Sequence, residues 1–151
     1  AFTFLEAVSK NQIESGNNQV VFMPLDLADF RSVHSFAETF LKTEPRLDIL
    51  INNAVFADMC IMGPGRTADG FCMAFGVNHL GHFLLTNLLL ERLKQCGPSR
   101  VVTVSALLHH LGRIDFALLG STKDLVSGQS AWQNFQAYCN SKLLTFVLFL
   151  N

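Results

Sequence analysis

Strand-type and helix-type segments alternate along this chain, and that alternation limits the folds open to it. Apolar, β-branched runs predict strands over residues 19–27, 47–54 and 100–105. Apolar residues at helical spacing predict helices over about 29–45, about 67–95 and from about 131 to the end. The order strand, helix, strand, helix, strand, helix predicts an α/β fold, a parallel sheet with helices on both faces.

Local signals refine these segments. Pro24 removes one ladder donor from the first predicted strand, which favours an edge position. Asp29 is a suitable N-cap for the following helix, and Pro45 is expected to stop it. The run 47–54 (LDILINNA) is continuously apolar, as in a strand buried on both faces. Residues 107–130 predict a long irregular connection, a length typical of functional loops.

Composition predicts one domain and excludes some functions. Half of the 151 residues are hydrophobic and 15% are charged, which is typical of a globular core. A net charge of -1 argues against nucleic acid as a partner. Four cysteines without a C-x-x-C pair predict neither zinc nor disulfides and favour an intracellular, reducing compartment. No apolar run reaches the ~18–20 residues of a membrane helix. The chain opens at Ala1 and stops inside an apolar helix, so we expect both ends to be cut.

Polar residues stand where the predicted strands end. Asp26 closes the first strand, Asn52 and Asn53 the second, and Ser105 the third. Ligands of open parallel sheets bind outside the carboxyl ends of the strands, so these residues predict a binding edge. Asn78 lies inside the second predicted helix and is either a structural bracket or a site residue, because a buried amide needs hydrogen-bond partners.

Tyr138 and Lys142 are four residues apart at the start of the last helix and therefore lie on one helix face. A neighbouring ammonium lowers the pKa of a phenol from its usual value of about 10. A tyrosine adjusted in this way can exchange a proton with an alcohol oxygen near neutral pH.

Five motifs together resemble the short-chain dehydrogenase/reductase family. They are Asp26-Leu27, Asn52-Asn53-Ala54, the segment 77–83 (VNHLGHF), the segment 100–105 (RVVTVS) and Tyr138-x-x-x-Lys142, in the order and spacing of that family. The segments 79–90 (HLGHFLLTNLLL) and 137–142 (AYCNSK) look most like the retinol-dehydrogenase-like branch. The resemblance covers essentially the whole chain. It implies that residues 1–151 are a partial NAD(P)-binding Rossmann-fold domain.

The resemblance also implies roles for single residues. Tyr138 would be the acid/base, Lys142 would hold the nicotinamide ribose, and Asn78 would anchor a water of the proton relay. The residues implied to bind NAD or NADP are Asp26, Leu27, Asn52, Asn53, Ala54, Val104, Tyr138 and Lys142. Family substrates are hydrophobic alcohols and carbonyls, such as retinoids, steroids and other lipids. The helix of Tyr138 commonly forms a dimer interface in the family, and longer relatives can associate with membranes.

The chain departs from the family pattern at three places. Ala106 stands where the catalytic serine is expected, and losing such a donor lowers rates by on the order of 10²–10³. Val55 replaces a glycine of the Asn-Asn-Ala-Gly motif, where a β-branched side chain tolerates neither close approach nor a positive φ. No T-G-x-x-x-G-x-G turn occurs, so the first strand–helix–strand unit, which would bind the pyrophosphate, is missing, as are the C-terminal strands.

Three hypotheses follow. The first is an oxidoreductase of this family that interconverts an alcohol and a carbonyl with reduced activity. The second is a non-catalytic protein that pairs with a full-length relative through exposed strand edges or the apolar run 143–150, which is otherwise plain core. The third is a fragment of an incomplete gene model. His79 and His82 lie one turn apart but lack a third ligand, so we expect local contacts and no metal.

Overall fold

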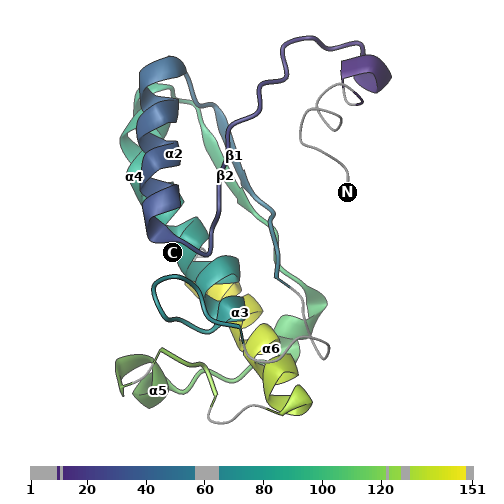
Figure 1. Ribbon diagram of the computed structural model, residues 1–151, viewed down its shortest axis with the longest axis vertical. Helices are drawn as coiled ribbons and strands as arrows, with labels where there is room; N and C mark the ends of the chain where they lie inside the picture. Colours follow the sequence, from purple (N-terminus) through teal and green to yellow (C-terminus); the bar gives the residue numbers. More distant parts are fainter. Residues whose placement is uncertain (1–9, 11, 57–64, 122, 127–129, 149–151) are drawn as a thin grey trace.

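The computed structural model describes residues 10, 12–56, 65–121, 123–126 and 130–148 (Figure 1). In chain order its elements are α2 (Phe30–Thr43), β1 (Ile49–Asn52), α3 (Met73–Phe75), the π-helix η1 (Gly76–Gly81), α4 (His82–Gln95), β2 (Arg100–Thr103), the 3₁₀ helix η2 (Leu107–Leu111), α5 (Phe116–Ser121) and α6 (Ala131–Leu148). This is a partial α/β fold with a short parallel sheet. None of the described helices is long and apolar enough to cross a membrane.

β1 and β2 pair in parallel, with Ile49 opposite Arg100 and Asn52 opposite Thr103. Two of the three predicted strands are therefore confirmed, with narrower bounds. The prediction of a strand over residues 19–27 was wrong: these residues belong to no strand among the described residues. A segment becomes a strand only where another strand supplies ladder hydrogen bonds, and neither β1 nor β2 pairs with this one.

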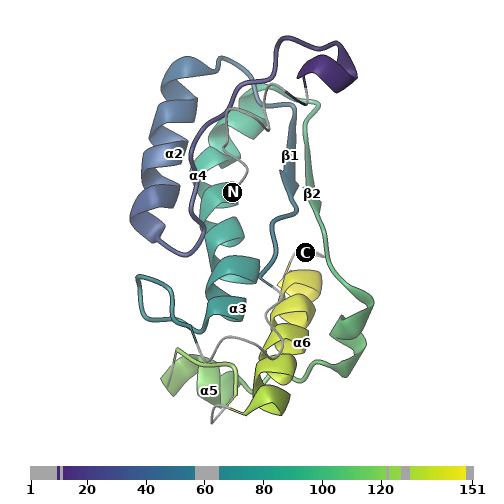
Figure 2. The same cartoon turned by 45° about the vertical axis from the view of Figure 1, so that its right-hand side comes forward.

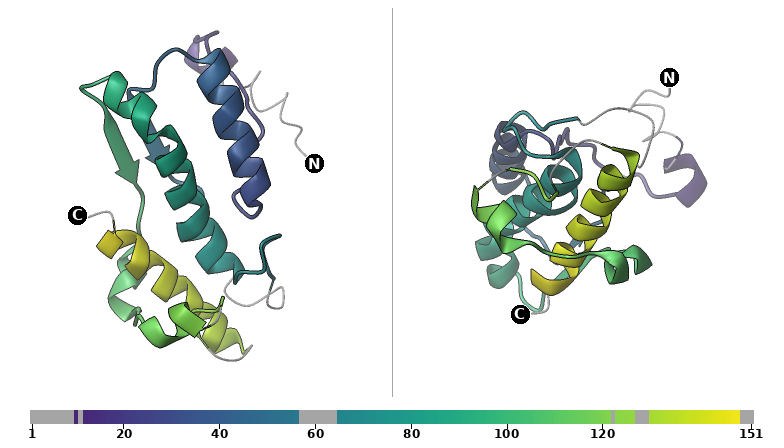
Figure 3. Two further views of the ribbon diagram at one scale, coloured as in Figure 1. Left: turned by 90° about the vertical axis from the view of Figure 1, so that its left-hand side faces the viewer. Right: turned by 90° about the horizontal axis from the view of Figure 1, so that it is seen from below.

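The helices α2 and α4 lie side by side on one side of the sheet (Figures 2 and 3). Their core contains Leu27, Val33 and Leu89, and Leu50 of β1 packs against it. On the other face Ile49 and Ile51 are 54% and 61% exposed. The expectation that this strand is buried on both faces was wrong, because the described residues place helices against one face only.

The helix α2 is set by its ends and by one apolar stripe. Asp29 is its N-cap, as predicted, and the Asp29 side chain accepts a hydrogen bond from the Arg31 amide. Val33 and Ala37 are buried at helical spacing. The helix ends at Thr43, ahead of Pro45.

The helix predicted from residue 67 begins only at Met73. Arg66 and Cys72 form an antiparallel bridge instead, so the intervening residues turn back on themselves. From Met73 the helix continues through η1 into α4. A Cβ on Gly81 would come within 2.6 Å of the Leu27 carbonyl oxygen, so a glycine here lets the helix lie against the segment before α2.

The helix α6 lies past the carboxyl ends of the two strands (Figure 2). It begins at Ala131, as predicted. The connection before it contains the short helices η2 and α5, which the sequence did not predict. A second core of Phe75, Leu125 and Leu144 joins α3 and this connection to α6.

Candidate active site

Tyr138 and Lys142 are both buried on α6, just beyond the end of β2. The Lys142 Nζ donates a hydrogen bond to the Val104 carbonyl at 3.3 Å, so the predicted ribose-holding residue and the predicted cofactor-lining residue are in contact. Lys142 is 3% exposed, and this burial lowers the pKa of its ammonium.

The pKa of Tyr138 does not follow the sequence prediction. Burial raises the pKa of the phenol above its usual value, and the Cys139 thiol adds to the rise. The expected lowering by Lys142 is not seen in the isolated chain. Removing the phenol from water disfavours the phenolate, and the Lys142 ammonium is bonded to a backbone carbonyl.

The residues after β2 show what replaces the serine. The Ser105 hydroxyl donates to the Lys142 carbonyl at 3.2 Å, so it is already used to fix α6. Ala106 has extended backbone and presents only a methyl group. Its carbonyl lies 2.7 Å from His109 Nδ1. Among these residues, the position expected to carry the catalytic hydroxyl carries none.

The contacts of Asn78 make it a structural bracket, which is one of the two roles that the sequence predicts for this residue. Its Oδ1 accepts from the Phe56 amide at 2.7 Å, and its Nδ2 donates to the Phe56 carbonyl and to Ser141 Oγ, both at 3.0 Å. The Asn78 carbonyl accepts from the Thr145 hydroxyl at 3.2 Å. The π-helix η1 thus ties the segment that follows β1 to α6. The role of Asn78 as an anchor for water stays a prediction.

Asn52 faces the helices. It is buried, and its Nδ2 donates to Thr86 Oγ1 at 3.0 Å and to Thr103 Oγ1 at 3.5 Å. Its Oδ1 is buried without a hydrogen-bond partner in the described part of the chain. Asn53 and Ala54 are exposed beyond the end of β1, where a ligand can reach them.

Val55 fits its backbone without strain. None of the described residues other than glycine has a positive φ, and the Val55 side chain is half exposed. Position 55 therefore does not require the positive φ that glycine permits. Any conflict with a ligand must come from the size of the side chain.

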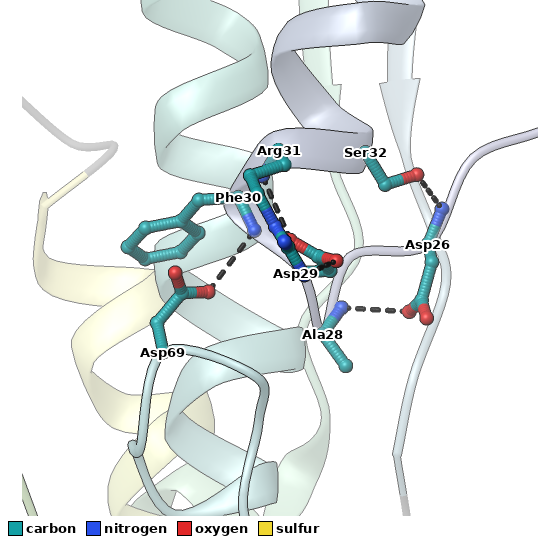
Figure 4. Close-up of polar contacts among 7 residues, drawn as sticks. All are labelled: Asp26, Ala28, Asp29, Phe30, Arg31, Ser32 and Asp69. Carbon is teal, nitrogen blue, oxygen red and sulfur yellow. Dashed lines mark hydrogen bonds and ion pairs between the residues drawn. The ribbon is translucent and has the colours of Figure 1, made fainter.

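Asp26 belongs to a group of hydrogen bonds at the start of α2 (Figure 4). Its carboxylate accepts from the Ala28 amide at 2.8 Å, and its amide lies 2.9 Å from Ser32 Oγ. Asp69 accepts from the Phe30 amide at 3.0 Å. Asp26 is exposed, whereas Leu27 is buried in the core between α2 and α4.

His79 and His82 make local contacts within the helix that carries them. His79 is stacked between Phe75 and Phe83, and burial lowers its pKa to about 4. His82 Nδ1 lies 3.4 Å from the Asn78 carbonyl. Within the described ranges no three His, Cys, Asp or Glu side chains are grouped to hold an ion. Cys72, Cys96 and Cys139 are free thiols.

Sequence reasoning missed the buried polar residues of α6 that follow Tyr138. Asn140, Ser141 and Thr145 are all buried and hydrogen-bonded. Their signal was present in the sequence as polar residues within an otherwise apolar helix, where each needs a partner.

The comparisons with known proteins agree with this geometry. The family described as short chain dehydrogenase matches residues 4–131. The chain is 51% identical to human retinol dehydrogenase 11 over 139 residues, which is 91% of this chain and 41% of that protein. It is 52% identical over 130 residues to the bovine dehydrogenase/reductase SDR family member 13, covering 86% of this chain and 32% of that protein. The chain thus spans about two fifths or less of these relatives.

Solved structures show the same fold. A crystal structure from Mycobacterium paratuberculosis is 37% identical, with a TM-score of 0.70 over 92% of this chain and 46% of that one. A Shigella flexneri short chain dehydrogenase complexed with NADP is 23% identical, with a TM-score of 0.64 over 95% of this chain and 53% of that one. The chain belongs to the short chain dehydrogenase family.

Proposed function

We propose that this chain carries the acid/base half of an NAD(P)-linked oxidoreductase that interconverts a lipid-like alcohol and its carbonyl, with reduced turnover. The observation that carries the proposal is the buried pair Tyr138 and Lys142 beside the end of β2. The names of the retinol dehydrogenase relatives support a retinoid as the first substrate to test.

Tyr138 exchanges the proton. In carbonyl reduction its phenol donates a proton to the substrate oxygen, and in alcohol oxidation its phenolate accepts one. Burial raises the Tyr138 pKa and so favours the protonated phenol, the form that donates a proton in carbonyl reduction.

The residues present fit one half of the cofactor. Lys142 uses one donor on Val104 and has further N–H groups for ribose hydroxyls, and Asn53 and Ala54 are open beyond β1. The nicotinamide supplies or takes up the hydride when bound. Residues 1–151 contain no Gly-rich turn before a helix that would bind the pyrophosphate half.

Turnover is reduced because Ala106 offers no hydroxyl to the reacting oxygen. Ser105 does not replace it, since its hydroxyl is bonded to the Lys142 carbonyl. One missing donor corresponds to a loss on the order of 10²–10³ in rate.

The test is the variant Ala106→Ser, assayed for reduction of retinaldehyde with NADPH and with NADH. We expect a rise in kcat on the order of 10²-fold, with little change in KM. Ala117→Ser is the matched control, because it adds the same hydroxyl to an exposed residue of α5. Equal rates for both variants and the parent chain would refute the role of position 106.

Cofactor binding is measured separately by thermal unfolding with millimolar NAD(H) or NADP(H). A ligand that binds only the folded chain adds about 2.7 kcal/mol at 100 times its Kd. A transition that neither cofactor raises would show that this chain alone does not bind NAD(P).

A second function is favoured by the open face of the sheet. Ile49, Ile51 and Val102 are large, apolar and exposed there. We propose, as the alternative, that this face pairs with a full-length relative without catalysis. Co-purification with that relative supports pairing, and a monodisperse monomer in its presence contradicts it. If the chain is instead a gene-model fragment, the complete transcript should encode a Gly-rich strand–turn–helix upstream.

A further inference from the structure

The connection between β2 and α6 wraps around α6. Ser105 contacts α6 at the Lys142 carbonyl. Further along, Gly112 lies so close to α6 that a Cβ on it would come within 2.7 Å of the Cys139 carbonyl oxygen and 2.8 Å of the Leu143 Cβ. Any side chain at position 112 would therefore push the connection off the helix.

Asn140 holds the next part of this connection at two points. Its Oδ1 accepts a hydrogen bond from the Arg113 amide at 2.8 Å, and its Nδ2 donates to the Leu125 carbonyl at 3.1 Å. The side chain is 2% exposed, so both bonds are shielded from water. A single amide thus joins the two ends of the segment 113–125 to the middle of α6.

Asn140 lies on the far side of the helix from Tyr138. Each residue of an α-helix turns by about 100°, so two residues place Asn140 about 200° from Tyr138. Lys142 is bonded to Val104 on the Tyr138 side. The helix is consequently held on two opposite faces within little more than one turn, which fixes its rotation about its own axis.

We propose that Asn140 is a positioning residue for Tyr138: by tying Arg113 and Leu125 to the far face of α6, it fixes the direction in which the phenol points. Asn140 itself does not touch the reacting atoms. The importance of this direction rests on the proposed function, but the direction itself can be measured without any turnover.

Tyr138 is the only tyrosine of the chain, which makes the measurement direct. Protein labelled with [13C]-tyrosine gives one set of ring signals, recorded at neutral pH for the parent chain and for Asn140→Leu. Asn87→Leu is the control, because Asn87 is an exposed residue of α4 whose side chain donates a hydrogen bond to the Phe83 carbonyl within its own helix. Hydrogen exchange is followed at the Arg113 amide in the same samples.

In Asn140→Leu we expect the tyrosine signal to move or split and the Arg113 amide to exchange on the order of tenfold faster, since one hydrogen bond is lost. Both readouts should stay unchanged in Asn87→Leu. An unmoved tyrosine signal together with faster Arg113 exchange overturns the proposal, because Asn140 would then hold the loop alone. A merely stabilising residue would change the unfolding midpoint without moving the native signal.

If Asn140→Leu does not fold, Asn140→Asp provides the measurement. Aspartate keeps the acceptor for Arg113 and loses the donor to Leu125. We expect a smaller displacement of the tyrosine signal, and a signal at the parent position overturns the proposal. Turnover of the parent chain is assayed independently. If the tyrosine signal shifts in the Asn140 variant but the parent chain shows no turnover, only the catalytic function is refuted. If the parent chain shows turnover but the tyrosine signal of the variant does not move, only the positioning role is refuted.

Discussion

Replacing Asn78 by alanine should remove the bracket between the segment after β1 and α6. Asn78 is 2% exposed and makes three side-chain hydrogen bonds, two with the Phe56 backbone and one with Ser141. Alanine makes none of them. The backbone groups of Phe56 would lose their protein partners, and part of the Asn78 volume would become a void.

The expected loss of stability follows from these contacts. A hydrogen bond contributes about 1 kcal/mol net, so three amount to about 3 kcal/mol, with neighbouring bonds not strictly additive. For a chain of this length that loss lowers Tm by about 6–12 °C. Ser141→Ala, which removes the partner hydroxyl, should lower stability by about 1 kcal/mol.

Urea unfolding followed by circular dichroism measures both variants. Asn87→Ala is the control, because this exposed asparagine bonds to Phe83 within α4 and alanine favours helix there. We expect its stability to be unchanged or slightly higher. A loss below about 1 kcal/mol for Asn78→Ala would refute the bracket, since an accessory amide would behave like the control.

Two further predictions concern buried titratable side chains. The pKa of His79 is about 4 in the folded chain and 6.5 in the unfolded chain, so between these pH values the unfolded chain binds an extra proton. The free energy of unfolding should therefore fall by about 3 kcal/mol as pH drops from 6.5 to 4. His79→Phe preserves the aromatic stack and should remove this part of the loss of stability at low pH, measured by urea unfolding at each pH. If the free energy of unfolding of the variant fell with pH as steeply as that of the parent chain, the prediction would be contradicted. Burial lowers the pKa of Lys142, so the unfolded chain again binds more protons and stability should rise with pH up to about 10.5. Lys142→Met should abolish turnover and raise stability at pH 7 by on the order of 1 kcal/mol, and a destabilised variant would show that the bond to Val104 outweighs burial.

The elements that sequence could predict are those fixed by local pattern. Asp29 and Pro45 marked the ends of α2, and the apolar runs marked β1 and β2. The predicted start of the second helix was wrong because the bridge between Arg66 and Cys72 competes with helix formation there. The prediction of a strand over residues 19–27 was wrong because strand formation depends on a neighbouring strand and not on composition alone.

The candidate site was predictable only in part, for a related reason. Tyr138 and Lys142 follow from helical spacing, but the direction of the Tyr138 pKa depends on burial, which no local pattern reports. The bond between Asn78 and Ser141 joins residues 63 positions apart, and Asn140 reaches Arg113 over 27 positions. Such partners become visible only once the elements are packed.

The contacts that hold α6, and with it the Tyr138–Lys142 pair, involve no phosphate-binding turn. Lys142 is joined to the end of β2, Ser141 to η1, and Asn140 to both ends of the segment 113–125. All of these partners lie within the described part of this chain. Acid/base geometry and cofactor affinity are therefore separable here, so Ala106→Ser should raise kcat even where the affinity for NAD(P) stays low.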